Sequence, residues 1–171
     1  MRRMMARPRF YPTNAARQRA YRKRLKEAAR RRKLWDPTGE TPQDLFEKYH
    51  AVFGFMLDVC ALPSNAKCPR YFTPDDDALQ QVWTGVCWCN PPYGRGKAIE
   101  KWVRKAHESA QAGAIVVCLL PSSTSSYWFH HIVLPYAAAY EFIEGRLKFG
   151  GTRYKYKARF DNMAAIFMPG V

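Results

Sequence analysis

The chain has 171 residues, which suits one domain with an appendage, and its 47% hydrophobic and 15% aromatic content supports a packed core. Its five cysteines show no paired spacing, which argues against a disulfide framework and for a reduced compartment. The basic N-terminus lacks an apolar signal segment and no run approaches 18 apolar residues, so we expect a soluble, cytoplasmic protein.

Positive charge is concentrated at the start of the chain. Residues 1–33 hold 14 of the 28 Lys and Arg residues and one of the 14 acids, so they contribute +13 to a net charge of +14. Asn14 can cap a helix over residues 15–33 that is basic on nearly every face. We predict a basic helical arm for nucleic acid over residues 1–36 and a main domain over residues 37–171, although a solvated helix that only aids solubility is the alternative. The candidate phosphate contacts in the arm are Arg22, Arg24 and Arg31.

A turn-rich linker over residues 36–40 precedes the first helix of the main domain. Thr41 can cap this helix, with Pro42 at its first position and Asp44 at the capping-box position. Gly54 is expected to end it.

An acid interrupts the apolar strand expected over residues 55–61. Asp58 is expensive to bury without partners, and two kinds of partner would compensate it: the backbone of the following loop, or the amine of a ligand. A short strand over residues 70–73 and an acidic turn over residues 74–77 follow.

Two cysteines share one face of the next strand, over residues 86–89. Cys87 and Cys89 could form a zinc site with Cys60 or Cys68, but no Cys-x-x-Cys or paired-His motif supports one, and we predict no metal. Free cysteines in apolar runs typically behave as small buried hydrophobic residues.

The remaining elements alternate between helix and strand. They are a helix from residue 98 that Gly113 ends, a central parallel strand over residues 115–120, a helix that begins at Ser125 or Ser126 and ends at Pro135, and closing antiparallel strands over residues 140–143 and 163–168. This alternation predicts an α/β fold of three layers with a mostly parallel sheet.

The most informative motif is Asn-Pro-Pro-Tyr at residues 90–93, directly after an apolar strand, because open α/β sheets bind ligands at that edge. The prolines have no N–H, so the turn presents carbonyl acceptors, to which Asn90 adds a side-chain carbonyl and Tyr93 a flat ring. These groups suit an exocyclic amine on a planar base. Held on Asn90 Oδ1 and the Pro91 carbonyl, the amine would become pyramidal and more nucleophilic. A tight turn with Asn90 as a local cap is the alternative.

Basic and aromatic residues alternate over residues 150–161. At a period of two, the charges fall on one face and the rings on the other. Such a ribbon could grip phosphate and help to extrude a base, whereas the alternative is an ordinary edge hairpin protected by Lys and Arg. The candidate DNA contacts in and before this segment, with one after the Asn-Pro-Pro-Tyr motif, are Arg95, Arg146, Lys148, Arg153, Lys155 and Lys157.

Several motifs stand in order along the main domain. They are Thr-Pro-x-x-Leu at 41–45, Leu-Asp-Val-Cys-Ala-x-Pro-x-Asn-Ala-Lys-Cys at 57–68, Tyr-Phe-Thr-Pro at 71–74, Trp-Cys-Asn-Pro-Pro-Tyr-Gly at 88–94 and Gly-Arg-Leu-Lys-Phe-Gly at 145–150. Together they resemble the phage-type DNA N6-adenine methyltransferases over roughly residues 41–168. The basic arm also looks like the segment that usually precedes the domain in that family.

The resemblance implies a reduced Rossmann-like class I methyltransferase that uses S-adenosylmethionine and methylates adenine N6 in double-stranded DNA after flipping the base out. By this resemblance the amine-binding residues would be Asn90, Pro91, Pro92 and Tyr93. The cofactor-binding residues would be Thr41 and Pro42 near the methionine end, Asp58 near its amino group, Cys60 and Asn65 in the same motif, and Asp75 or Asp77 at the ribose hydroxyls.

Two departures separate the chain from the family pattern. Leu-Pro-Ser-Asn at residues 62–65 replaces the usual Gly-x-Gly loop, and the flanking strands lie too close in sequence for a helical crossover. Residues 122–126 are all Ser or Thr, where relatives often carry Arg and Asp. Two alternatives stay open: a catalytically silent nucleic-acid-binding protein with a degenerate methyltransferase fold, or methylation of another amino group, such as cytosine N4, adenine in RNA or a glutamine amide.

Overall fold

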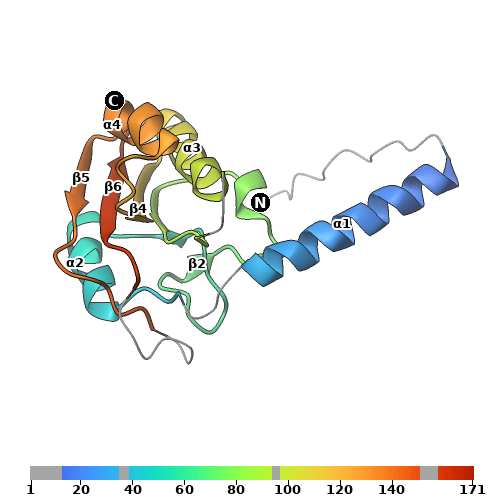
Figure 1. Ribbon diagram of the computed structural model, residues 1–171, viewed down its shortest axis with the longest axis horizontal. Helices are drawn as coiled ribbons and strands as arrows, with labels where there is room; N and C mark the ends of the chain where they lie inside the picture. The colour runs from blue at the N-terminus through green and yellow to red at the C-terminus, as the bar shows by residue number, and fades with distance from the viewer. Residues whose placement is uncertain (1–12, 35–38, 94–96, 151–157) are drawn as a thin grey trace.

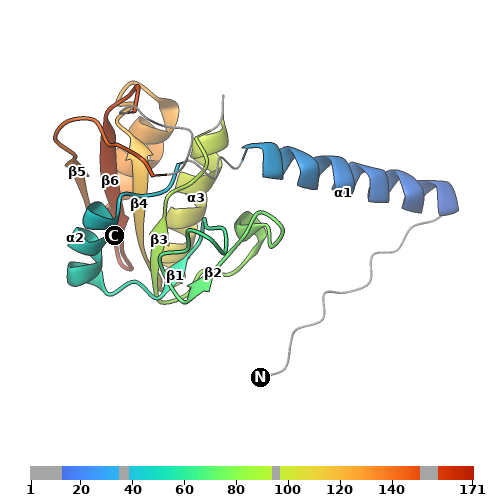
Figure 2. The same cartoon turned by 90° about the horizontal axis from the view of Figure 1, so that it is seen from below.

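The computed structural model describes residues 13–34, 39–93, 97–150 and 158–171, with a sheet flanked by helices on both faces (Figure 1 and Figure 2). The six strands of the sheet are β1 (Leu57–Asp58), β2 (Arg70–Tyr71), β3 (Val86–Cys89), β4 (Ile115–Pro121), β5 (Ala139–Phe142) and β6 (Asn162–Phe167). Their order across the sheet is β2-β1-β3-β4-β6-β5. The first four run parallel, while β6 is antiparallel to both β4 and β5. The predicted mixed α/β architecture with antiparallel closing strands is confirmed.

The two faces of the sheet bury different side chains because successive residues of a strand point in opposite directions. One face packs against α3 (Ala98–Gln111) and the helical turn η2 (Phe129–Val133), with Val116 and Cys118 of β4 pointing toward them. The other face packs against α2 (Gln43–Phe53) and buries Trp88 and Val117. These two cores make the three layers that the sequence predicted.

Helix α3 and strand β4 form as their sequence patterns predicted. The buried side of α3 includes the expected residues Ile99, Trp102, Val103, Ala106 and Ala110. Every residue of β4 after Ile115 is buried, which is typical of a central strand covered by helices on both faces. Gly113, with a φ of 100°, ends the helix and turns the chain toward β4.

Helix α1 spans Asn14–Leu34 and carries the basic sequence of the predicted arm. In Figure 1 and Figure 2 it projects from the body as a straight rod. Its cap is Thr13, whose Oγ1 accepts a hydrogen bond from Ala16 N–H at 3.1 Å, and Asn14 is the first helical residue; the expected Asn14 cap was wrong. Tyr21 and Leu25 are exposed to solvent, at 58% and 52%. Packing of these side chains against the body therefore does not stabilise the helix.

Helix α2 begins one residue later than predicted and without the predicted cap. Pro42 takes the cap position in an extended conformation, with no side-chain cap hydrogen bond, and the helix starts at Gln43. Asp44 Oδ1 accepts from the adjacent Leu45 N–H at 2.9 Å instead of closing a capping box. The hydroxyl of Thr41 is used elsewhere, against side chains of β3 and the residue after it. Gly54 ends the helix as expected, with a φ of 65° and its N–H on the His50 carbonyl.

The connection from β1 to β2 contains turns and no helix within residues 59–69. Pairing extends beyond the short strands, because Met56 N–H donates to Val86 O and Ala61 N–H donates to Phe72 O. The 3-10 turn η1 (Ala78–Gln80) then leads to β3, whereas β3 and β4 are joined by the full helix α3. The sequence predicted that no helix would connect these two strands. Loops therefore cover the carboxyl end of β1.

The helix after β4 ends one residue later than predicted. Ser126 Oγ accepts from Phe129 N–H at 3.4 Å, which agrees with the predicted start. Pro135 lies inside α4 (Leu134–Tyr136) instead of ending the helix. The preceding turn, η2, is a π-helix, and such widening accommodates a residue that cannot donate a backbone hydrogen bond.

Candidate active site

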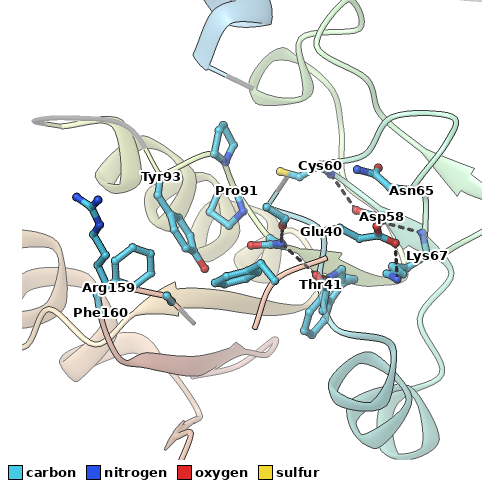
Figure 3. Close-up of a pocket in the computed structure, with 16 residues that line it drawn as sticks. Glu40, Thr41, Asp58, Cys60, Asn65, Lys67, Pro91, Tyr93, Arg159 and Phe160 are labelled. Carbon is cyan, nitrogen blue, oxygen red and sulfur yellow. Dashed lines mark hydrogen bonds and ion pairs between the residues drawn. The ribbon is translucent and has the colours of Figure 1, made fainter. Parts of the chain in front are cut away.

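A cavity of about 510 Å³ lies at the carboxyl ends of β1 and β3 (Figure 3). Its walls come from the segment before α2, from the residues that follow β1 and β3, and from residues 149 and 158–160. This size lies within the range of small-molecule sites, and the carboxyl edge of a parallel sheet is where such sites form. The cavity contains the Asn-Pro-Pro-Tyr residues that the sequence singled out, Asn90, Pro91, Pro92 and Tyr93.

The amide of Asn90 is oriented by the segment that precedes α2. Its Nδ2 donates to the Gly39 carbonyl at 2.7 Å and to Thr41 Oγ1 at 3.1 Å. An amide nitrogen has two protons, so both are used. The acceptor Oδ1 is therefore the atom that Asn90 can offer to a ligand in the cavity.

Asp58 is held by backbone N–H groups at the end of β1. Its side chain is 3% exposed, and its two oxygens accept from Cys60 N–H at 3.0 Å and from Lys67 N–H at 3.1 Å. Burial raises the pKa of this carboxyl group above its ordinary value, and the two backbone hydrogen bonds and the Lys67 charge only partly oppose that rise. The loop after β1 is thus one partner of Asp58.

An ion pair crosses the cavity wall between the linker and the loop after β1. Lys67 Nζ lies 3.2 Å from Glu40 Oε1 and 2.9 Å from Gln43 Oε1, and the lysine side chain is only 9% exposed. The backbone of Glu40 pairs with Gly150, whose N–H donates to Glu40 O at 2.9 Å. Figure 3 shows Glu40, Asp58 and Lys67 gathered at one end of the cavity. This end therefore carries two carboxylates and one ammonium group.

Aromatic side chains form the other end of the cavity. Tyr93 donates its hydroxyl hydrogen to the Leu119 carbonyl at 2.9 Å, and burial raises the pKa of this phenol well above its ordinary value, so it stays protonated. Phe149 and Phe160 meet the Tyr93 ring edge-on, at centroid distances of 6.1 and 5.4 Å. A fixed tyrosine ring flanked by two phenylalanines offers a surface for a planar group.

The structure brings six of the eight predicted cofactor and amine residues other than prolines into the cavity wall. These are Thr41, Asp58, Cys60, Asn65, Asn90 and Tyr93. Asn65 Oδ1 accepts from Leu62 N–H at 2.8 Å, so this side chain also builds the loop. Pro42, Asp75 and Asp77 are not in the wall. Asp77 starts η1 with a φ of 55°, and Asp75 is exposed in the turn before it.

The predicted DNA contacts are spread over two surfaces. Arg22 and Arg24 are exposed on α1, and Lys148 is exposed near the cavity. Arg146 is exposed and lies 3.5 Å from Asp161 Oδ1. Five predicted contacts lie outside the described residues or side chains: Arg31, Arg95, Arg153, Lys155 and Lys157.

Sequence reasoning missed several cavity residues. The sequence predicts a linker at Glu40 and a loop at Lys67, and neither pattern indicates a role for these side chains. Phe149 belongs to the Gly-Arg-Leu-Lys-Phe-Gly motif and Phe160 to the predicted ribbon, and neither pattern indicates that the two rings contact Tyr93. The adjacency of Lys67 to the Asp58 motif was the one available hint, whereas the pairing of Glu40 with Gly150 joins segments far apart in sequence.

No helix among the described residues is long and apolar enough to cross a membrane. The same residues contain no group of three His, Cys, Asp or Glu side chains placed to hold a metal ion.

The chain is similar to known proteins. A family model described as DNA N-6-adenine-methyltransferase (Dam) matches residues 25–168. The DNA N-6-adenine-methyltransferase of Haemophilus phage HP1 (strain HP1c1) is 36% identical over 92 residues, which cover 52% of this chain and 52% of the phage protein. YfdM of Escherichia coli (strain K12), a protein named for an expected methyltransferase activity, is 38% identical over 61 residues, covering 31% of this chain and 67% of its own length. The match thus spans about half the length of the phage relative.

Proposed function

The chain belongs to the DNA N-6-adenine-methyltransferase (Dam) family, and from this premise we propose that it transfers a methyl group from S-adenosylmethionine to the N6 amino group of adenine in DNA. The fold would be a reduced, Rossmann-like class I methyltransferase, in which the β1–β2 crossover has lost its helix. Such a substrate would place the protein in the cytoplasm of a bacterial or phage-infected cell.

The observation that carries this proposal is the orientation of Asn90. Both Nδ2 protons are held by Gly39 and Thr41, which leaves Oδ1 as an acceptor at the cavity. An adenine amine donating to Oδ1 and to the Pro91 carbonyl would have its lone pair freed from the ring. Fixed acceptors of this kind stabilise the transition state more than the planar ground state. The amine loses its proton to solvent after transfer, so the chain needs no dedicated base.

The charged end of the cavity fits the amino-acid part of the cofactor. Asp58 and Glu40 can bind its ammonium group, and Lys67 can bind its carboxylate, either in place of or beside the Glu40 ion pair. The raised pKa of Asp58 supports this assignment, because a cation beside a buried carboxylate stabilises its ionised form. The bound cofactor supplies an electrophilic methyl group on a sulfonium sulfur. Asp75 and Asp77 remain predicted ribose contacts, although they stand outside the cavity wall.

We further propose that the target base is flipped out and placed against Tyr93. The hydrogen bond from the Tyr93 hydroxyl to Leu119 fixes the ring, and the two phenylalanines restrict its movement. Basic residues that are exposed on α1 and at Arg146 and Lys148 would contact phosphate. Unstacking a base costs a few kcal/mol, which such contacts would offset.

The first test is Asn90→Ala. We expect methyl transfer from labelled S-adenosylmethionine to DNA to be abolished, with DNA affinity by filter binding or anisotropy largely kept, because the alanine removes only the amine acceptor. Asn14→Ala, at the exposed start of α1, is the matched control and should methylate normally. Asn90→Ala that methylates at an undiminished rate would contradict the mechanism. Mass spectrometry of the methylated nucleosides, after incubation with DNA and RNA, separates adenine N6 from cytosine N4 and DNA from RNA.

A second function is favoured by one observation, the helix-free β1–β2 connection that stands in place of a Gly-rich loop. A protein that keeps the methyltransferase fold but has a defective cofactor site would bind nucleic acid without catalysis. Calorimetric titration with S-adenosylmethionine distinguishes the two functions. Micromolar affinity supports the enzyme, and millimolar or absent binding supports the silent binding protein.

A further inference from the structure

Thr41 makes contacts that neither a helix cap nor a surface residue would make. Its side chain is 4% exposed, and Oγ1 lies 3.1 Å from Asn90 Nδ2 and 3.3 Å from the Nε1 of Trp88, which is itself fully buried. The indole N–H can only donate, so one lone pair of the hydroxyl accepts from Trp88. The hydroxyl is therefore anchored on the buried core side of the sheet before it reaches Asn90.

A carbonyl on the other side fixes which way the Asn90 amide faces. Gly39 O lies 2.7 Å from the amide and can only accept, so the atom facing it must be Nδ2. With one Nδ2 proton on Gly39, the second proton points to the remaining lone pair of Thr41 Oγ1. If the amide turned over, Oδ1 would meet the Gly39 oxygen at hydrogen-bond distance, and two acceptors would repel each other.

We propose that Thr41 is a positioning residue that holds the Asn90 amide with Oδ1 toward the amine of the target base. This inference rests on the proposed function, because it specifies how that site is kept in its reactive arrangement. Thr41 takes this role through Asn90 and through Trp88, the residue two positions before Asn90 on β3. The role differs from that of the cofactor contact predicted from the sequence, since it affects the reacting amine and not the affinity for S-adenosylmethionine.

The kinetic test compares Thr41→Val with Thr41→Ser. Valine keeps the shape but leaves one Nδ2 proton of Asn90 and the Nε1 proton of Trp88 without a partner, so kcat should fall about tenfold or more while the calorimetric Kd for S-adenosylmethionine stays unchanged. Serine keeps the hydroxyl and should restore kcat to within about threefold of the wild-type protein. Thr84→Val, at an exposed residue before β3, is the matched control and should leave both quantities unchanged. A weaker cofactor affinity with normal kcat at saturation would overturn the proposal in favour of a cofactor contact.

A second measurement does not depend on activity. In the full-length protein, NMR should show both Asn90 side-chain amide protons protected from solvent exchange, with their signals assigned by comparison with Asn90→Ala. Thr41→Val should expose one of the two protons and leave the Gly39-bonded proton protected, while Thr41→Ser keeps both. Two freely exchanging protons in the wild-type protein, or no change in Thr41→Val, would overturn the inference. If the wild-type protein does not methylate DNA, the proposed function fails, and these amide signals still decide the role of Thr41.

Discussion

Asp58 is a carboxylate whose cost of burial is not fully compensated by the chain. Its pKa is raised by burial, so in the free protein it holds its proton to a higher pH than an ordinary aspartate would. A cation bound beside it favours the ionised form. Binding of a ligand with an ammonium group should therefore release a proton when the pH lies between the lower pKa of the bound state and the raised pKa of the free protein.

This gives a prediction for the pH dependence of cofactor affinity. As the pH rises through the raised pKa of Asp58, affinity for S-adenosylmethionine should increase and then level off, with proton release detected by calorimetry in two buffers of different ionisation enthalpy. 5′-Deoxy-5′-methylthioadenosine lacks the amino-acid part and should bind with a flat profile. The same slope for both ligands would show that Asp58 does not face the ammonium group. Protein stability should change in the opposite sense, being greatest below the unfolded-state pKa and falling as the pH rises toward the folded-state pKa.

The sequence predicted which residue types meet in the site, but not the contacts that hold them. Asn-Pro-Pro-Tyr after an apolar strand was enough to identify the acceptor atoms. The orientation of the amide depends on Gly39 and Thr41, about 50 positions away, and the Thr-Pro pattern favoured a helix cap. A threonine hydroxyl can accept a hydrogen bond from a helix N-terminus or from a distant side chain. The local sequence favours neither, so the tertiary structure decides which bond forms.

At the scale of elements, Gly54 shows how a single backbone angle ends α2 and starts the path to β1. Its φ of 65° is in the left-handed region, and a Cβ there would meet no atom within 4 Å. Gly54→Ala should therefore destabilise the protein by about 1 kcal/mol through backbone strain alone, measured by urea unfolding. Gly54→Asn should cost less, because asparagine tolerates this conformation. Equal stability of the alanine variant and the wild-type protein would contradict a strain-based cost.

The long, periodic elements were predicted correctly, and the boundary details were not. Helix α3 has an apolar stripe at helical spacing and β4 has an unbroken apolar run, so each pattern allows one arrangement. The errors at Asn14, Thr41 and Pro135 all concern helix ends or irregular turns. At those positions several polar side chains or a widened turn can satisfy the same backbone groups, and the differences in free energy between them are small.

At the scale of the whole molecule, charge divides the chain into a basic helix and a nearly neutral body. Deleting residues 1–33 should weaken DNA binding and flatten its dependence on salt, because each phosphate contact contributes about 0.9 to the slope of log K against log salt, and losing ~5 contacts would lower the slope by ~4 units. Affinity for S-adenosylmethionine should hardly change, since the cavity is built from other residues. An unaltered salt slope would show that α1 aids solubility or binds another partner.

The cavity as a whole could not be predicted from local patterns. Its charged end joins Glu40 to Lys67 and to Gly150, and its aromatic end joins Tyr93 to Phe149 and Phe160. These pairs connect segments far apart in the chain, and no local sequence pattern in one segment indicates its contact with the other. Without an α-helix between β1 and β2, the loop after β1 lies directly against the segment before α2, and that closeness creates the charged end.

The hydrogen bond between Gly39 and Asn90 also limits how far the end of α1 can lie from the cavity. Five peptide steps separate Leu34, the last residue of α1, from Gly39 at the cavity, so the chain can stretch at most roughly 18 Å between them. A duplex held by the C-terminal end of α1 would thus stay within roughly 18 Å, about three turns of an α-helix, plus the reach of one side chain, of the Asn90 amide. After one methylation the same duplex would be present at a high effective concentration, which favours another encounter over escape. Successive sites on one DNA molecule should then be methylated before the protein leaves it.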